Sequence, residues 1–267
     1  MILTNVARQF QAVFDVPETD YSSGAIGEWY SMIMEHDETD IDLIKANVAT
    51  GAFVVDLMCG RGRVLRRLLD AGYDGRGVDI NPEAVEAARQ SMHFEMHFVH
   101  GDAFRWLPEQ TPDAVYMGGL IVSMFDLSAV DRLLAHVRSF LRPGGHIFFD
   151  FLPTVENQSG WRGDFVVPIK PQGSGSFVIT STQRDEIKRE QITEFYLHRQ
   201  DQSAIQQEFA CHYLRLHETA DIEVVLSANG FDIKSVIDSY QFDEGGIDHQ
   251  MPYWPVRKLH AQVSQGR

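Results

Sequence analysis

The chain has 267 residues, of which 44% are hydrophobic, 11% aromatic and 23% charged. This composition is typical of a globular protein and excludes intrinsic disorder, a collagen helix and a coiled coil. The 23 Lys and Arg residues against 38 Asp and Glu residues give a net charge of −15. Such an acidic chain repels nucleic acid and anionic membrane surfaces, so we expect neither as a partner.

The cysteine content and the N-terminus bear on the cellular compartment. Cys59 and Cys211 are too few for a disulfide scaffold or for a zinc site with four cysteine ligands. Residues 1–16 lack the basic start, the uniform apolar stretch and the small cleavage-site residues of a signal peptide. No apolar run approaches the ~20 residues that a membrane-spanning helix needs. We therefore expect a cytoplasmic protein.

The N-terminal part is predicted to be helical. Apolar residues recur at helical spacing over residues 3–14, which indicates an amphipathic helix. A short helix is expected over residues 29–34. Another helix is expected to begin at Thr39 or Asp40, which have the short polar side chains that cap helices.

From residue 51 to residue 152, short apolar runs alternate with segments of helical period. This alternation predicts βαβ units and a parallel sheet, in which ligands bind beyond the carboxyl ends of the strands. The expected strands cover residues 52–58, 75–80, 96–102, 113–119 and 146–152. The expected helices cover residues 64–73, 82–92 and 127–141.

The remaining residues have a different pattern. Four successive antiparallel strands are expected over residues 165–169, 176–186, 191–200 and 205–217. A helix over residues 219–230 and strands over residues 231–242 and 254–263 follow. The predicted layout is therefore an N-terminal helical cap (1–50), a core (51–152), an antiparallel β insert (153–217), and a final helix and strands that complete the core sheet (218–267).

The strongest chemical signal lies where strand 52–58 leads into the next helix. This strand contains Asp56 and runs into the turn CGRG. Glycine has no Cβ, so Gly60 and Gly62 let the backbone approach a ligand closely, and the helix start offers free N–H groups. A Gly-x-Gly turn alone is a weak signal, because many βαβ units use one only for packing.

Two further carboxylates follow neighbouring predicted strands. Asp79 ends the second strand in GVDIN, where a carboxylate can accept two hydrogen bonds from a ribose diol. Asp102 follows the third strand in GDAF, where it is placed to bind an adenine amino group. The carboxyl ends of three successive strands thus carry acidic side chains.

Together these motifs resemble the class I S-adenosylmethionine (SAM)-dependent methyltransferases. The resemblance covers residues 40–152 and recurs in SANGF at residues 227–231. It rests on DxxCGxG from Asp56, on Asp79, on Gly101-Asp102-Ala103, on strand 113–119, and on LRPGG before the fifth strand. It implies an α/β fold with a doubly wound, seven-stranded Rossmann-like sheet, to which the helical cap and the β insert are added.

The resemblance also implies a cofactor site for SAM, with S-adenosylhomocysteine as the product. Cys59 is expected to be a small buried residue of the turn rather than a nucleophile. The aromatic N-terminal segment is expected to reach the site, or else to fill the core between the first helix and the sheet. The predicted cofactor-binding residues are Asp56, Cys59, Gly60 and Gly62 (methionyl side), Asp79 (ribose), Ile80, Asp102 and Ala103 (adenine), Met117 and Gly118 (sulfonium), and Tyr21 and Tyr30.

A dinucleotide-binding domain is the competing interpretation of the glycine turn. Its fingerprint G-x-G-x-x-G/A needs a third small residue for close packing of helix and strand. Leu65 occupies that position here. The pyrophosphate-binding variant is therefore disfavoured, whereas SAM carries no phosphate and makes no such demand.

The acceptor is predicted to be a small molecule. The fourth strand ends in YMGG rather than in the Asn/Asp-Pro-Pro-Tyr that methyltransferases of nucleobase or amide nitrogens often carry. The layout resembles amino-sugar and glycine-type N-methyltransferases, in which an insert and an N-terminal helix close over the substrate. An amine acceptor is therefore favoured over a hydroxyl or carboxylate. A non-catalytic SAM-binding sensor or subunit and a methyltransferase of protein or carrier-bound substrates stay open.

Residues for substrate binding and catalysis are less well marked. We expect Trp29, Trp161 and Tyr196 to contact the substrate, and His198 to act as a base or a substrate anchor, although a histidine in a strand is more often structural. No cluster with metal-ligand spacing is apparent, so no metal is predicted. The helix over residues 3–14 could equally well form a homodimer contact.

Overall fold

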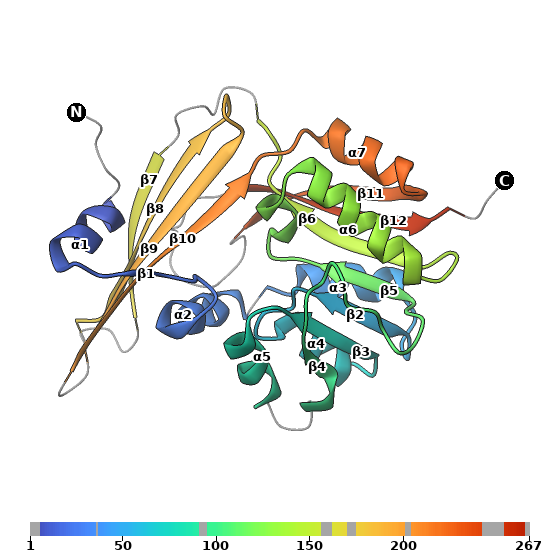
Figure 1. Ribbon diagram of the computed structural model, residues 1–267, viewed down its shortest axis with the longest axis horizontal. Coiled ribbons are helices and arrows are strands. Elements are labelled where there is room, and N and C mark those ends of the chain that lie inside the picture. The colour runs from blue at the N-terminus through green and yellow to red at the C-terminus, as the bar shows by residue number, and fades with distance from the viewer. Residues whose placement is uncertain are drawn as a thin grey trace. The chain divides into compact units, whose positions relative to one another are not determined.

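The computed structural model describes residues 6–35, 37–90, 95–155, 162–169, 175–200, 204–241 and 254–264. The chain divides into two compact units, each built around its own sheet (Figure 1). Unit 1 contains the described residues up to Met34 and those from Val155 to Leu216. Unit 2 contains the described residues from Glu35 to Thr154 and from His217 onward.

Unit 2 contains a seven-stranded sheet with the strand order β11-β12-β6-β5-β2-β3-β4. The pairs from β6 to β4 are parallel, and β12 runs antiparallel to both of its neighbours. The strands are β2 (Phe53–Leu57), β3 (Asp74–Asp79), β4 (Phe98–His100), β5 (Ala114–Met117), β6 (His146–Phe151), β11 (Phe231–Gln241) and β12 (Trp254–Val263).

Helices cover both faces of this sheet. On one face, α3 (Thr39–Asn47) and α4 (Arg63–Asp70) pack in a cluster that includes Ile44 and Leu68. On the other face, α6 (Leu127–Phe140) and α7 (Thr219–Ala228) cover the larger apolar cluster. The fifth helix of the unit, α5 (Pro82–Arg89), packs beside β4. The prediction of a doubly wound, seven-stranded α/β sheet is therefore confirmed.

Local sequence signals account for several element boundaries. The side chain of Asn81 accepts hydrogen bonds from two backbone N–H groups at the start of α5, where Pro82 occupies the first turn. Asp126 caps α6 in the same way. Gly72, with a φ of 87°, lies just beyond the end of α4 in a conformation that glycine adopts readily.

Two segments of unit 2 differ from the sequence prediction. The strand expected over residues 96–102 is shorter, since a 3-10 turn (η1, Glu95–His97) precedes β4. A 3-10 turn (η2, Ile121–Met124) also follows β5, and Leu120 before it has a left-handed φ of 64°. Such a backbone conformation is unfavourable for leucine, so no sequence pattern predicts it.

Unit 1 contains a five-stranded sheet with the order β1-β10-β9-β8-β7. Strands β7 to β10 are antiparallel neighbours, and the short β1 adds in parallel to β10. The strands are β1 (Glu18–Thr19), β7 (Arg162–Pro168), β8 (Phe177–Asp185), β9 (Glu190–Gln200) and β10 (Ile205–Arg215). The expected succession of antiparallel strands is thus present, whereas β1 was not expected.

The two N-terminal helices cover opposite faces of this sheet. The first, α1 (Val6–Phe14), packs against the side chains of Tyr196 and Phe209. The second, α2 (Gly24–Met34), packs its Trp29 against Phe195. Adjacent residues of a strand point to opposite faces, and Phe195 and Tyr196 are adjacent in β9.

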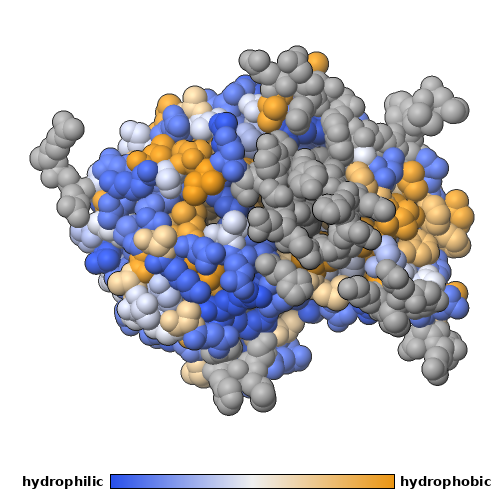
Figure 2. All heavy atoms as spheres, turned by 180° about the vertical axis from the view of Figure 1, so that it is seen from behind, coloured by the Kyte–Doolittle hydropathy of each residue, from blue (hydrophilic) through white to orange (hydrophobic). Residues whose placement is uncertain are grey.

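The surface is mixed in character. In Figure 2, hydrophobic side chains gather in small patches among a hydrophilic majority. Among the described helices, none combines the length and the apolar character that crossing a bilayer requires.

The start of α2 is held by a carboxylate from the sheet. The two oxygens of Glu208 in β10 accept hydrogen bonds from the backbone N–H groups of Ala25 (3.1 Å) and Ile26 (2.9 Å). We predict that Glu208→Ala lowers the free energy of unfolding of unit 1 by about 1–2 kcal/mol, because the helix loses its N-terminal hydrogen-bond acceptor. Urea denaturation followed by tryptophan fluorescence measures this effect.

A surface ion pair of the same unit provides the control. Glu28 lies 3.4 Å from Arg199, and both side chains are at least one-third exposed. Glu28→Ala should therefore change stability by no more than about 0.5 kcal/mol. Equal effects of the two variants would contradict the assignment of Glu208 as the cap of α2.

Candidate functional site

The candidate site of unit 2 lies at the carboxyl ends of β2, β3 and β4. These strands are parallel neighbours, so the segments that follow them meet at one edge of the sheet. Asp56, Asp79 and Asp102 occupy this edge, as the sequence predicts.

Hydrogen bonds join the turn after β2 to the end of β3. The backbone N–H of Cys59 donates to the carbonyl oxygen of Val78 (3.1 Å), and that of Gly60 donates to Oδ2 of Asp79 (2.7 Å). The other carboxylate oxygen of Asp79 accepts from the backbone N–H of Asn81 (2.8 Å). Asp79 therefore fixes the turn after β2 relative to the start of α5.

The two glycines of the turn meet different requirements. Both have a left-handed φ, of 53° at Gly60 and 77° at Gly62. A Cβ on Gly62 would lie 2.5 Å from the ring of Phe98, so that glycine is needed for packing. A Cβ on Gly60 would meet no atom within 4 Å. The backbone at Gly60 therefore faces open space, where a ligand can approach it.

The residues that follow β3 and β4 add an apolar surface and a further carboxylate. The side chain of Ile80 is 66% exposed, which is unusual for an isoleucine directly after a buried strand. Asp102 is partly exposed, and its Oδ1 accepts from the backbone N–H of Phe104 (2.9 Å). Ala103 is buried in the core.

The segment after β5 is held by a carboxylate from β6. The backbone N–H groups of Gly119 and Leu120 donate to the oxygens of Asp150 at 3.2 Å and 2.7 Å. Met117, predicted to lie beside the sulfonium, is fully buried in the core. A Cβ on Gly118 would collide with the phenol oxygen of Tyr116, which shows how closely this ring packs on the glycine.

Burial sets the charge of several groups at this edge. Asp56 is 3% exposed, and burial raises its pKa to about 8, in spite of the opposing charge of Arg63. Burial also raises the pKa of the Cys59 thiol well above its ordinary value. A thiol in this state is a poor nucleophile, in keeping with the expected packing role of Cys59.

A buried ionic group lies beneath the edge, on the face that α3 and α4 cover. Asp40 of α3 accepts from Lys258 Nζ (2.5 Å) at Oδ1 and from the hydroxyl of Tyr116 (2.7 Å) at Oδ2. Arg63, the first residue of α4, lies 3.4 Å from Oδ2 of Asp40. Lys258 is also the residue opposite Asp150 in the backbone register of β12 and β6.

The sequence analysis assigned no member of this group to the site, and it named Asp40 only as a possible cap of a helix. The available signal was the presence of ionisable residues within largely apolar strands, such as Tyr116 in AVYM, Asp150 in HIFFDF and Lys258 in WPVRKLH. A buried charge requires a partner of opposite charge. The sequence alone does not show which partner each one has.

Comparisons with known proteins identify this part of unit 2. Residues 54–145 match the protein family described as "Methyltransferase domain". This part of the chain is a methyltransferase domain. The family that the sequence motifs resemble is thereby confirmed.

Solved structures extend the likeness in fold. CalS10, an amino pentose methyltransferase from Micromonospora echinaspora, is 19% identical with a TM-score of 0.67, covering 91% of this chain and 98% of its own. The sugar N-methyltransferase KedS8 from Streptoalloteichus sp ATCC 53650 is 18% identical with a TM-score of 0.64, covering 91% and 97%. Because both identities are below 25%, this likeness shows a similar fold alone.

A curated relative matches part of the chain at higher identity. The ribosomal protein L11 methyltransferase of Cupriavidus taiwanensis is 33% identical over 106 residues, which are 39% of this chain and 33% of that protein. The chain thus matches about a third of the length of its curated relatives.

The predicted aromatic residues outside the methyltransferase domain that the structure describes lie in unit 1, on both faces of its sheet. Tyr21 stacks on His212 with ring centroids 4.1 Å apart, and Tyr30 and Trp29 contact Phe195 on the α2 face. Trp29 is buried. Trp161 lies outside the described residues.

Tyr196 and His198 lie on the other face of this sheet. Tyr196 is buried beneath α1, and its hydroxyl accepts from Nε2 of Gln207 (2.7 Å). His198 shares this face and stacks on Phe177. The sheet therefore separates Trp29 from Tyr196 and His198, so one binding site cannot be lined by all three residues.

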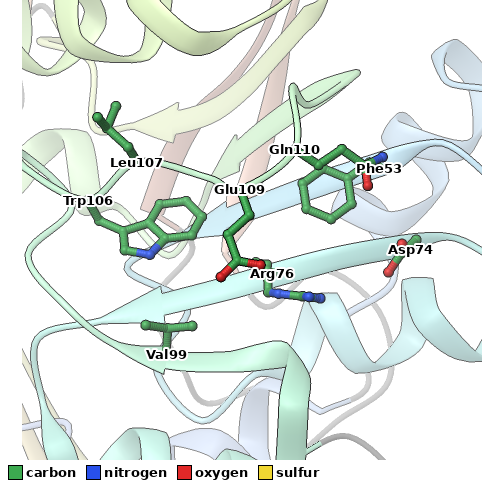
Figure 3. Close-up of a pocket in the computed structure, with 8 residues that line it drawn as sticks. All are labelled: Phe53, Asp74, Arg76, Val99, Trp106, Leu107, Glu109 and Gln110. Atoms are coloured by element: carbon green, nitrogen blue, oxygen red, sulfur yellow. The ribbon is translucent and has the colours of Figure 1, made fainter.

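A cavity of about 390 Å³ lies at the opposite end of the methyltransferase sheet (Figure 3). Phe53 and Asp74 begin their strands there, whereas the candidate site is at the carboxyl ends. The side chains of Arg76, Trp106 and Glu109 also line this cavity. It is therefore separate from the candidate site.

The geometry of the turn yields a paired prediction. Gly62→Ala should lower the free energy of unfolding by about 2–4 kcal/mol, because it adds a collision with Phe98 to left-handed backbone strain. Gly60→Ala should cost only the strain, about 1–2 kcal/mol. Chemical denaturation of both variants tests the difference, and a reversed order would contradict the distinct roles of the two glycines.

The raised pKa of Asp56 predicts how stability depends on pH. A carboxyl with a raised folded pKa keeps a proton that the unfolded chain releases, so stability falls as pH rises toward that pKa. Asp150, with a pKa of about 6, acts in the same direction at lower pH. His212 and His260, with pKa values lowered to about 4, act in the opposite direction below about pH 6.5.

Among these groups, Asp56 is expected to contribute most of the change between about pH 7 and pH 8. We predict that the protein loses about 1 kcal/mol of stability over this interval and that Asp56→Asn removes this loss. Asp42→Asn, on the exposed side of α3, serves as the control and should keep the wild-type slope. A wild-type slope in Asp56→Asn would show that another group titrates.

Proposed function

We propose that this chain transfers a methyl group from S-adenosylmethionine to a small-molecule acceptor, with an amine nitrogen as the favoured acceptor. The observation that carries the proposal is the open backbone at Gly60, fixed by Asp79 at the carboxyl edge of a methyltransferase domain. The likeness to CalS10 and KedS8, whose names describe amino pentose and sugar N-methylation, supports an amine acceptor.

The residues of this edge fit such a cofactor. Asp79 stands at the end of β3 with both carboxylate oxygens accepting backbone N–H groups, and a carboxylate at this position can accept hydrogen bonds from a ribose diol. The exposed Ile80 beside it offers an apolar face to an adenine ring. Asp102, two residues beyond the end of β4, is the residue proposed to bind the adenine amino group. Gly60 allows close approach of the methionyl part, and Asp56 lies beneath it.

When bound, the cofactor supplies an electrophilic methyl group on a positively charged sulfur. The protein then has to hold the acceptor about 3 Å from that carbon and in line with the breaking bond. The turn fixed by Asp150, with Gly118 and Gly119, is the part of this edge proposed to lie beside the sulfur. An amine acceptor has to be neutral, and transfer out of water favours its neutral form. A hydroxyl acceptor would need a base.

Methylation of a protein is the second candidate. It rests on the identity to ribosomal protein L11 methyltransferases, which is higher than the identity to the sugar enzymes but covers only 39% to 40% of this chain. A shared domain fixes the cofactor chemistry more firmly than the acceptor.

Direct binding and turnover assays test the proposal. Isothermal titration should detect binding of SAM and S-adenosylhomocysteine. S-adenosylhomocysteine release should then be measured with pools of amino sugars, amino acids, hydroxyl and carboxylate compounds, and unmodified ribosomal protein. Turnover with the amine pools supports the proposal, and turnover with the protein alone supports the second candidate. No cofactor binding at millimolar concentration would refute both.

Asp79 provides a sharper test of the cofactor geometry. We predict that Asp79→Ala weakens S-adenosylhomocysteine binding roughly 5- to 150-fold, which corresponds to about 1–3 kcal/mol for the loss of charged hydrogen-bond acceptors. Asp74→Ala, at the amino end of the same strand, is the matched control and should bind normally. Equal affinities for both variants would mean that Asp79 does not hold the ribose.

A further inference from the structure

A row of buried ionisable residues crosses the methyltransferase sheet just beneath the proposed cofactor edge. Asp56 pairs in register with Tyr116 across β2 and β5, and Asp150 pairs with Lys258 across β6 and β12. Tyr116 pairs with Phe148, which lies two residues before Asp150, so all of these side chains share the face covered by α3 and α4.

Asp40 is the residue that joins this row together. Its carboxylate, buried on α3, contacts Lys258 through one oxygen, and Tyr116 and Arg63 through the other. Burial alone would raise the pKa of Asp40, but the charges of Lys258 and Arg63 hold it below the ordinary value. Asp40 is therefore an anion that three neighbouring side chains contact at the same time.

Each of these neighbours leads to a segment of the proposed cofactor site. Arg63 directly follows Gly62, so its position sets the end of the glycine turn. Tyr116 packs its phenol oxygen against the backbone of Gly118. Lys258 lies beside Asp150, whose oxygens accept the N–H groups of the segment after β5.

Arg63 also anchors the chain that precedes Asp40. Its Nη1 donates to the carbonyl oxygen of Asp37 (2.5 Å), and Arg67, one turn later in α4, hydrogen-bonds to Glu35 and Glu38. The segment before α3 and the first turns of α4 are therefore held together by two arginines. A shift of α3 would be transmitted to α4 and from there to the glycine turn.

We propose that Asp40, which lies outside the matched domain region, is a positioning residue that holds the glycine turn and the segment after β5 in the geometry for cofactor binding. The inference rests on the proposed function, since it concerns the same site. Asp40 is placed below the cofactor edge and acts through Arg63, Tyr116 and Lys258.

The test compares a variant that removes the charge of Asp40 alone with a variant that removes the charges of both Asp40 and Lys258. Asp40→Asn removes the nearest anion of two buried cations, Lys258 and Arg63, so it should lower both stability and cofactor affinity. We expect the dissociation constant of S-adenosylhomocysteine to rise about tenfold, and KM for SAM to rise more than kcat falls. Asp42→Asn, an exposed position of the same helix, should leave both unchanged.

The double variant Asp40→Asn/Lys258→Met separates positioning from a merely structural role. Removing both charges should restore much of the stability, because the uncompensated lysine is gone. Cofactor affinity should nevertheless stay low, since Arg63 and Tyr116 still lack the carboxylate. If affinity recovers together with stability, the role of Asp40 is structural only and the inference is wrong.

Tyr116→Phe keeps the test decisive should the Asp40 variants fail to fold. It removes one hydroxyl and retains the ion pair, so we expect normal folding and about two- to tenfold weaker S-adenosylhomocysteine binding. Wild-type affinity in folded Asp40→Asn or in Tyr116→Phe would overturn the inference. Absence of binding by the wild-type protein would instead refute the proposed function.

Discussion

The geometry of the methyltransferase domain depends on how buried charges compensate one another on one face of its sheet. An uncompensated charge in a protein interior is so unfavourable that each ionisable group there must have partners. Asp40 is such a partner for Lys258 and Arg63. Asp150 accepts hydrogen bonds from the backbone N–H groups of the segment after β5. The same contacts also fix the loops at the carboxyl edge. Compensation of buried charge and shaping of the proposed site are thus one arrangement.

The part of the candidate edge whose placement the sequence predicts is encoded locally. Strand, glycine turn and helix follow one another within residues 52–73, and the parallel order of the strands then brings Asp56, Asp79 and Asp102 to one edge. Even here the two glycines could not be told apart from the sequence. Gly62 is needed because of Phe98, which lies 36 residues later in the chain (98 − 62).

The parts that the sequence analysis missed depend on long-range pairing. Asp40 and Lys258 are separated by 218 residues, and nothing in either neighbourhood indicates the other. The substrate residues predicted for unit 1 show a second reason. Period-two patterns place Tyr196 and His198 on one face of a strand, but they do not show which helix covers that face. The structure places α1 over Tyr196 and Trp29 over the opposite face.

Three buried aspartates show how the same side chain acquires different charge states within one sheet. Asp40, with two cations and a hydroxyl, has a lowered pKa. Asp150, whose pKa is raised by burial and by the like charge of Asp40 and lowered by Lys258 and two backbone N–H groups, has a pKa of about 6. Asp56, for which burial outweighs Arg63, has one of about 8. The negative charge beneath the edge therefore increases through the neutral pH range, and a positively charged ligand bound there would draw protons off Asp56 and Asp150. The charge that the cofactor edge presents is thus set by the number of donors around each carboxylate, more than by the overall charge of −15.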